Sequence, residues 1–98
     1  MTEQEIYKQA LEKFGIEAQI GQLHEEIGEL MVAISKLRRY YNKYHYEPEL
    51  LKSEVLSEIA DVEIMLEQVK IHFNISNFWD FENIKKGKLL KLESYLKD

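Results

Sequence analysis

The stretch that decides the fold reads QLHEEIGELMVAISKL, from Gln22 to Leu37. Its apolar residues recur at the three- and four-residue spacing that places them on one face of an α-helix. The same spacing continues in both directions and predicts a long helix from Ile16 to about Tyr44. The apolar stripe of this helix comprises Ile16, Ile20, Leu23, Ile27, Leu30, Ile34, Leu37 and Tyr41.

Three glutamates accompany this stripe, at positions 25, 26 and 29. At about 100° per residue, Glu26 and Glu29 fall on one flank of the stripe, whereas Glu25 falls roughly opposite it. The periodicity therefore predicts that Glu26 and Glu29 are half-buried. On the other flank, Gly21, Gly28 and Ser35 form a row of small residues. Either this row lets another helix approach closely, or the two glycines are simply tolerated at about 1 kcal/mol each.

A second long helix is predicted from Pro48 to about Phe73, because proline fits the first turn of a helix. Its main apolar stripe comprises Val55, Ile59, Val62, Leu66, Val69 and Phe73. One side of the stripe is lined by Glu54, Glu58, Asp61 and Met65. A second apolar band contains Leu56, Ala60, Ile64 and Ile71 and requires a further partner surface.

Two shorter helices complete the predicted fold. The first runs from Thr2 to about Lys13 and ends at Gly15, and the last runs from Phe81 to Leu96. In the last helix we expect four apolar side chains to point inward: Phe81, Leu89, Leu92 and Leu96. The whole pattern predicts a single all-α domain over residues 1–98. We expect an antiparallel helical bundle with two long acidic helices, completed by oligomerisation because more apolar surface exists than one small chain can cover.

Composition excludes several classes of function. The chain has 98 residues and a formal net charge of −5, which argues against broad binding to nucleic acid or to anionic membranes. It has no cysteine, so a metal must be held by oxygen or imidazole ligands. The N-terminal residues lack the pattern of a signal peptide, and the apolar runs are short. We therefore expect a soluble cytoplasmic protein.

The acidic residues of the two long helices form two pairs with i, i+3 spacing, Glu26 with Glu29 and Glu58 with Asp61. Like charges at this spacing repel each other, and more strongly when they are partly desolvated. A hard divalent cation such as Mg²⁺, or Mn²⁺, would offset the repulsion. The competing interpretation is that these are ordinary solvated acids.

A di-iron site is a different use of carboxylates on helices, and it requires Glu-x-x-His elements. None of the three histidines of this chain is preceded by glutamate at that spacing. We therefore interpret His24, His45 and His72 as surface or packing residues.

The acidic residues resemble the signature of a known family. The segment Glu25-Glu26-Ile27-Gly28-Glu29, followed by Glu58-Ile59-Ala60-Asp61, is similar to the E-E-x-x-E … E-x-x-D motif of the MazG-like, all-α nucleoside triphosphate pyrophosphohydrolases. The resemblance extends over roughly residues 14–96 and is strongest to the short, single-domain members found in bacteria and their phages.

The resemblance implies a homodimer or homotetramer that binds Mg²⁺ between the two acidic helices. It implies hydrolysis of a nucleoside triphosphate between the α and β phosphates, which releases a monophosphate and pyrophosphate. The implied metal ligands are Glu26, Glu29, Glu58 and Asp61. Glu25 matches the first glutamate of the motif and is implied either to bind a second metal or to orient the attacking water.

Two lysines of the last helix, Lys88 and Lys91, match basic positions of the family and are implied to contact the phosphates. Many relatives carry a further basic residue where this chain has Tyr95; Lys85 and Lys86 are candidates to replace it, or belong to a solvated face.

A function of another class competes with this interpretation, namely a non-catalytic helical oligomer or interaction module whose acidic faces serve solubility or a basic partner.

Overall fold

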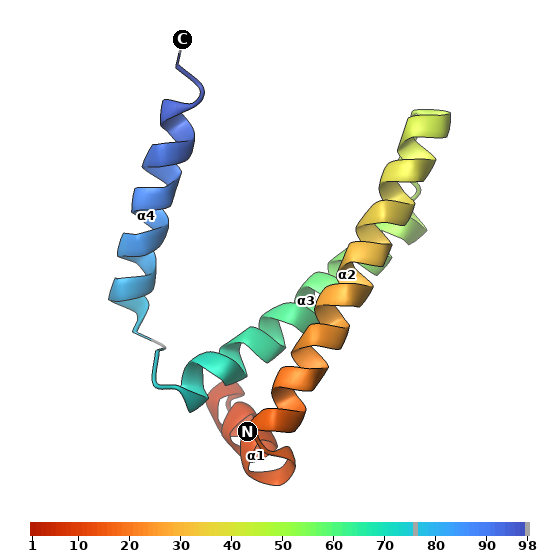
Figure 1. Ribbon diagram of the computed structural model, residues 1–98. Helices are drawn as coiled ribbons and strands as arrows, with labels where there is room; N and C mark the ends of the chain where they lie inside the picture. The colour runs from red at the N-terminus through yellow and green to blue at the C-terminus, as the bar shows by residue number, and fades with distance from the viewer. Residues whose placement is uncertain (76, 98) are drawn as a thin grey trace.

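The computed structural model describes residues 1–75 and 77–97, and this part of the chain is all-helical, as predicted (Figure 1). The elements are α1 (Glu3–Phe14), α2 (Ile16–Tyr44), α3 (Glu49–His72) and α4 (Phe78–Ser94). No strand occurs among the described residues. None of the described helices carries an apolar span long enough to cross a membrane.

The first two helices end where the backbone adopts positive φ angles. Gly15 has φ 83° and donates its N–H to the carbonyl of Leu11, which ends α1 before α2 begins at the next residue. His45 adopts the left-handed conformation at φ 54° and donates its N–H to the carbonyl of Tyr41, which ends α2. Pro48 then precedes the first turn of α3, as its fixed φ favours.

The last helix begins earlier than predicted, at Phe78 instead of Phe81. Asn77 causes the difference because its side-chain oxygen accepts hydrogen bonds from the backbone N–H groups of Trp79 and Asp80, at 2.9 and 3.3 Å. Asparagine is a preferred residue at this capping position. Trp79 therefore belongs to the first turn of α4.

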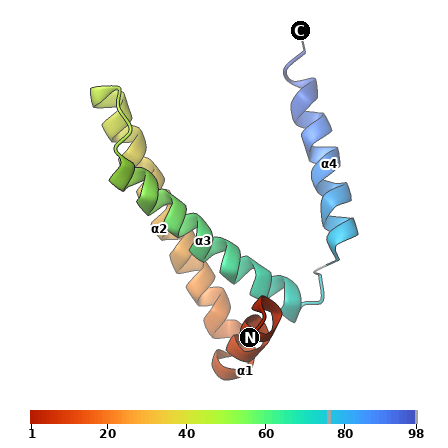
Figure 2. The same ribbon diagram turned by 180° about the vertical axis from the view of Figure 1, so that it is seen from behind.

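Helices α2 and α3 form a hairpin and lie side by side in opposite directions, whereas α1 packs across the end where α2 begins and α3 ends (Figures 1 and 2). Between the two long helices, the least exposed side chains of α2 follow an alternating four- and three-residue spacing typical of coiled-coil packing. They are Gln19, Leu23, Glu26, Leu30, Ala33 and Leu37. The facing row of α3 comprises Leu51, Glu54, Glu58, Asp61, Met65 and Gln68.

These rows differ from the predicted stripes. Ile27 and Ile34, which the sequence pattern places in the centre of the apolar face of α2, are 37% and 47% exposed. Ile59 of α3 is likewise 37% exposed. The packed rows are displaced by about one position toward the acidic flank of each helix. The carboxylates of Glu26, Glu58 and Asp61 consequently lie within the interface, not beside it.

Helix α4 projects away from the α2–α3 pair (Figures 1 and 2). Its described side chains include none that is buried. Leu89 and Leu92 are 54% and 56% exposed, and Phe81 and Leu96 are exposed as well, so the prediction that these four point inward is wrong for the single chain. Phe81 is held to the end of α3 by the ammonium of Lys70, which lies 4.8 Å from the centre of its ring.

Candidate metal centre

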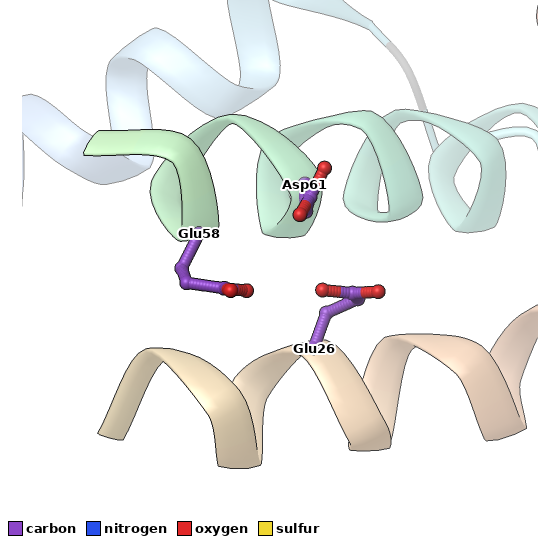
Figure 3. Close-up of side chains that lie close together, drawn as sticks. All are labelled: Glu26, Glu58 and Asp61. Carbon is purple, nitrogen blue, oxygen red and sulfur yellow. The ribbon is translucent and has the colours of Figure 1, made fainter. Parts of the chain in front are cut away.

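Three carboxylates meet between the two long helices. Glu26 projects from α2 toward α3, and Glu58 and Asp61 project from α3 toward Glu26 (Figure 3). One oxygen from each of the three side chains lies within 4.8 Å of the others. Three of the four predicted metal ligands therefore come together, on the two helices that the sequence indicated.

Helix geometry explains why these three side chains converge. Glu58 and Asp61 are three residues apart and so project from the same face of α3. Glu26 occupies the position between Leu23 and Leu30 in the packed row of α2. An apolar residue at this position would complete the row, so the interface contains a layer of acids in the place of a layer of hydrocarbon.

The carboxylates are incompletely satisfied by the protein. Gln22, one turn before Glu26, donates its side-chain N–H to Glu26 Oε1 at 2.7 Å. Glu26 Oε2 and Glu58 Oε2 are buried and have no hydrogen-bond partner among the described residues. A buried polar atom without a partner typically costs about 1–3 kcal/mol, and more when it is charged. These two oxygens are therefore free to bind a cation or a hydrogen-bond donor.

The local electrostatics agree with that conclusion. Burial, followed by the charge of Glu29, raises the pKa of Glu58 above its ordinary value. The charge of Glu26, followed by desolvation, raises the pKa of Glu29. Both effects disfavour the ionised carboxylate, and a cation placed among the acids would reverse them.

Glu29 and Glu25 lie at the edge of this cluster. Glu29 is exposed, so the prediction that it is half-buried is wrong; position 29 falls outside the row formed by Glu26, Leu30 and Ala33. Glu29 nevertheless lines the same groove as Glu58. Glu25 is exposed, in agreement with its predicted orientation away from the stripe.

The predicted phosphate-binding lysines lie elsewhere in the single chain. Lys88 and Lys91 are exposed on α4, which projects away from the α2–α3 pair (Figure 1). One copy of the chain therefore does not bring them to the three carboxylates. The histidines at positions 24, 45 and 72 are all exposed, as a surface role predicts.

An open groove adjoins the acidic cluster. It has a volume of about 610 Å³ and lies between α2 and α3. Its lining comprises Glu25, Gly28, Glu29, Val32, Ala33, Lys36, Glu54 and Glu58. Apart from neighbouring atoms of α2 itself, no atom of the described residues lies within 4 Å of where a Cβ on Gly28 would be, so the small-residue flank of α2 faces open space here. The groove and the cluster share Glu58.

Some residues of this region were not singled out as site residues from the sequence. Gln22 precedes Glu26 by four residues, and this i, i+4 spacing is the signal for their hydrogen bond. Lys36 and Glu54 form a loose ion pair at 4.0 Å across the groove. No pattern within a single helix signals such a pair, because its members come from two helices whose relative register only packing determines.

The donor set is appropriate for a hard divalent cation. Carboxylate oxygens are typical ligands of Mg²⁺, which usually keeps several waters and binds one or two carboxylates together with substrate phosphates. Two oxygens on opposite sides of Mg²⁺ are about 4.2 Å apart at ordinary bond lengths. Oxygens of three carboxylates that lie within 4.8 Å of one another could together hold one such ion.

Comparisons of the chain with protein-family models, with curated proteins and with solved structures found no match. The geometry of the site is therefore the basis for assigning a function.

Proposed function

We propose that this protein is a Mg²⁺-dependent nucleotide pyrophosphohydrolase of the MazG-like, all-α family. The observation that carries the proposal is the pair of buried carboxylate oxygens without partners, Glu26 Oε2 and Glu58 Oε2, beside Asp61. An acidic layer of this kind destabilises the interface unless a cation binds there. The order of the two acidic motifs along the chain, on two helices that pack together, supports the choice of this family.

The reaction requires a water molecule to attack the α phosphorus of a nucleoside triphosphate. The bond between this phosphorus and the oxygen that bridges to the β phosphate then breaks, and pyrophosphate leaves with the bonding electrons. Bound Mg²⁺ would neutralise phosphate oxygens and lower the pKa of the water. Glu26, Glu58 and Asp61, together with Glu29, would hold the cation. Glu25, an exposed residue that lines the groove, would accept the proton from the water.

The proposal includes assembly into a homodimer or homotetramer. Large apolar side chains are exposed on the outer faces of α2 and α3 and along α4, among them Met31, Leu56 and Leu90. Contiguous exposed apolar surface is characteristic of protein interfaces. In such an assembly, α4 of one copy would lie near the acidic cluster of another, which would bring Lys88 and Lys91 to the phosphates. Light scattering coupled to size-exclusion chromatography measures the mass; a monomer at micromolar concentration would refute this part.

Pyrophosphate release tests the reaction. Purified protein is incubated with the common ribo- and deoxyribonucleoside triphosphates, with Mg²⁺ or with a chelator, and pyrophosphate is quantified. We expect release that requires Mg²⁺ and is lost in Glu58→Gln, but that is retained in Glu49→Gln, a matched change on the exposed start of the same helix. Absence of release from folded protein across the panel would favour the non-catalytic interaction module.

A further inference from the structure

The groove beside the acidic cluster has two chemically different ends. Glu29 and Glu58 lie at the end that adjoins the proposed metal centre, and Lys36 and Glu54 lie at the other end. Glu29 and Lys36 are seven residues apart on α2, which corresponds to about 10 Å along the helix axis. A ligand whose phosphates bind at the acidic end therefore extends the rest of its structure toward Lys36 and Glu54.

The middle of the groove is apolar and open. Val32 is 58% exposed and Ala33 contributes a small, buried side chain to the floor. The missing side chain of Gly28 leaves the backbone of α2 accessible at the same place. A flat ring can pack against such a surface, and burying Val32 beneath it would be favourable.

The far end of the groove carries a hydrogen-bond donor, Lys36, and an acceptor, Glu54, that interact only weakly with each other. The ammonium of Lys36 lies 4.0 Å from a carboxylate oxygen of Glu54, and the two side chains are 52% and 42% exposed. A solvent-exposed pair of this kind contributes only about 0–1 kcal/mol to stability. Little is therefore lost when either group turns to a ligand.

We propose that this groove binds the nucleoside part of the substrate and that Glu54 and Lys36 select guanine. The proposal rests on the proposed function, because it takes the triphosphate to be held at the acidic end. Guanine presents two neighbouring donors, N1–H and the N2 amino group, which the two oxygens of one carboxylate accept together. Its O6 is adjacent and accepts a hydrogen bond from the lysine ammonium. Adenine, cytosine and uracil do not offer two neighbouring donors on this edge.

Exchanging the acceptor for an amide tests the assignment. Xanthine has a carbonyl oxygen where guanine has the N2 amino group, so Glu54→Gln can donate to that oxygen and still accept from N1–H. We expect wild-type protein to hydrolyse GTP with a kcat/KM about tenfold or more above that for XTP. We expect Glu54→Gln to reverse the order, and ITP, which lacks the amino group, to be a poorer substrate than GTP for the wild type. Glu49→Gln should preserve the wild-type preference.

The outcomes separate this inference from the proposed function. Turnover without a preference for guanine, or with a preference that Glu54→Gln leaves unchanged, overturns the inference and leaves the pyrophosphohydrolase intact. If no nucleotide is turned over, the proposed function fails, and calorimetric binding of GMP and XMP in the presence of Mg²⁺ decides the inference. Tighter GMP binding by the wild type, reversed in Glu54→Gln, supports it; equal or absent binding overturns it.

Discussion

The α2–α3 interface contains two layers of polar side chains, and these layers differ in how far their buried polar atoms are hydrogen-bonded within the protein. Near the α1 end, Gln19 donates its side-chain amide to Gln68 at 2.6 Å, and Gln68 also donates to the carbonyl of Ile64 at 3.4 Å. This layer is neutral, buried and internally hydrogen-bonded. Two turns along α2, Glu26 meets Glu58 and Asp61 with buried oxygens that have no partner. The polar groups of the first layer are hydrogen-bonded to each other, whereas the second layer could bind a cation.

The largest expected difference between the layers is their response to metal. In the wild type, Mg²⁺ at one hundred times its dissociation constant should increase the free energy of unfolding by about 2.7 kcal/mol. Asp61→Asn removes one ligand charge and should abolish most of this gain, with the helical content retained. Thermal unfolding followed by circular dichroism, with and without Mg²⁺, measures it, and Glu49→Gln is the control. An undiminished gain in Asp61→Asn would remove Asp61 from the site.

The glutamine layer should respond to mutation without regard to metal. Gln68→Ala leaves the Gln19 amide buried without its partner, which should lower the free energy of unfolding by about 1–3 kcal/mol. Urea unfolding should give the same loss in chelator and in saturating Mg²⁺. The double variant Gln19→Leu, Gln68→Leu removes both polar groups and should be closer to the wild type. A loss for Gln68→Ala that depends on Mg²⁺ would mean that the two layers are coupled.

Mutation of Gln22 should have a smaller effect, which is confined to metal binding by the acidic layer. Its amide donates a hydrogen bond to Glu26 Oε1 at 2.7 Å and so restrains the orientation of that carboxylate. Removal of such a supporting hydrogen bond typically weakens metal binding by about tenfold or more. Isothermal titration of Gln22→Ala with Mn²⁺ measures the change, and Gln9→Ala, an exposed glutamine of α1, is the control. Unchanged affinity would show that Glu26 is oriented by packing alone.

The pH dependence of stability should show the smallest effect. Because the pKa values of Glu29 and Glu58 are raised, the metal-free folded chain takes up protons at a higher pH than the unfolded chain does. As pH falls from neutral toward the ordinary glutamate pKa of 4.5, protonation of these two groups should therefore increase the free energy of unfolding.

Urea unfolding in chelator measures this effect as the difference between the wild type and Glu29→Gln, Glu58→Gln. We expect the wild type to gain stability relative to the double variant on acidification. A relative loss would contradict the raised pKa values. With Mg²⁺ present, protons compete with the cation, so acidification should weaken metal binding instead.

The elements of the fold could be predicted from local signals. Helix α2 has the predicted bounds because Gly15 and the end of the apolar pattern near Tyr44 are visible in the chain itself. The start of α4 differs by three residues from the prediction because the Asn77 cap sets it, whereas the apolar pattern begins only at Phe81. Of the acidic residues, the prediction of partial burial is confirmed for Glu26 and wrong for Glu29.

The sequence by itself determined that the chain is helical, where each long helix runs, and that acids accompany the apolar stripes of α2 and α3. These properties follow from interactions within about four residues, which is the range of helical hydrogen bonds and capping. Which flank of each stripe is packed depends instead on the partner helix. An antiparallel pair selects rows with an average period of 3.5 residues, and these rows include Glu26, Glu58 and Asp61. Only the tertiary structure could therefore decide that the carboxylates face one another, and that Lys36 and Glu54 meet at the end of the same groove.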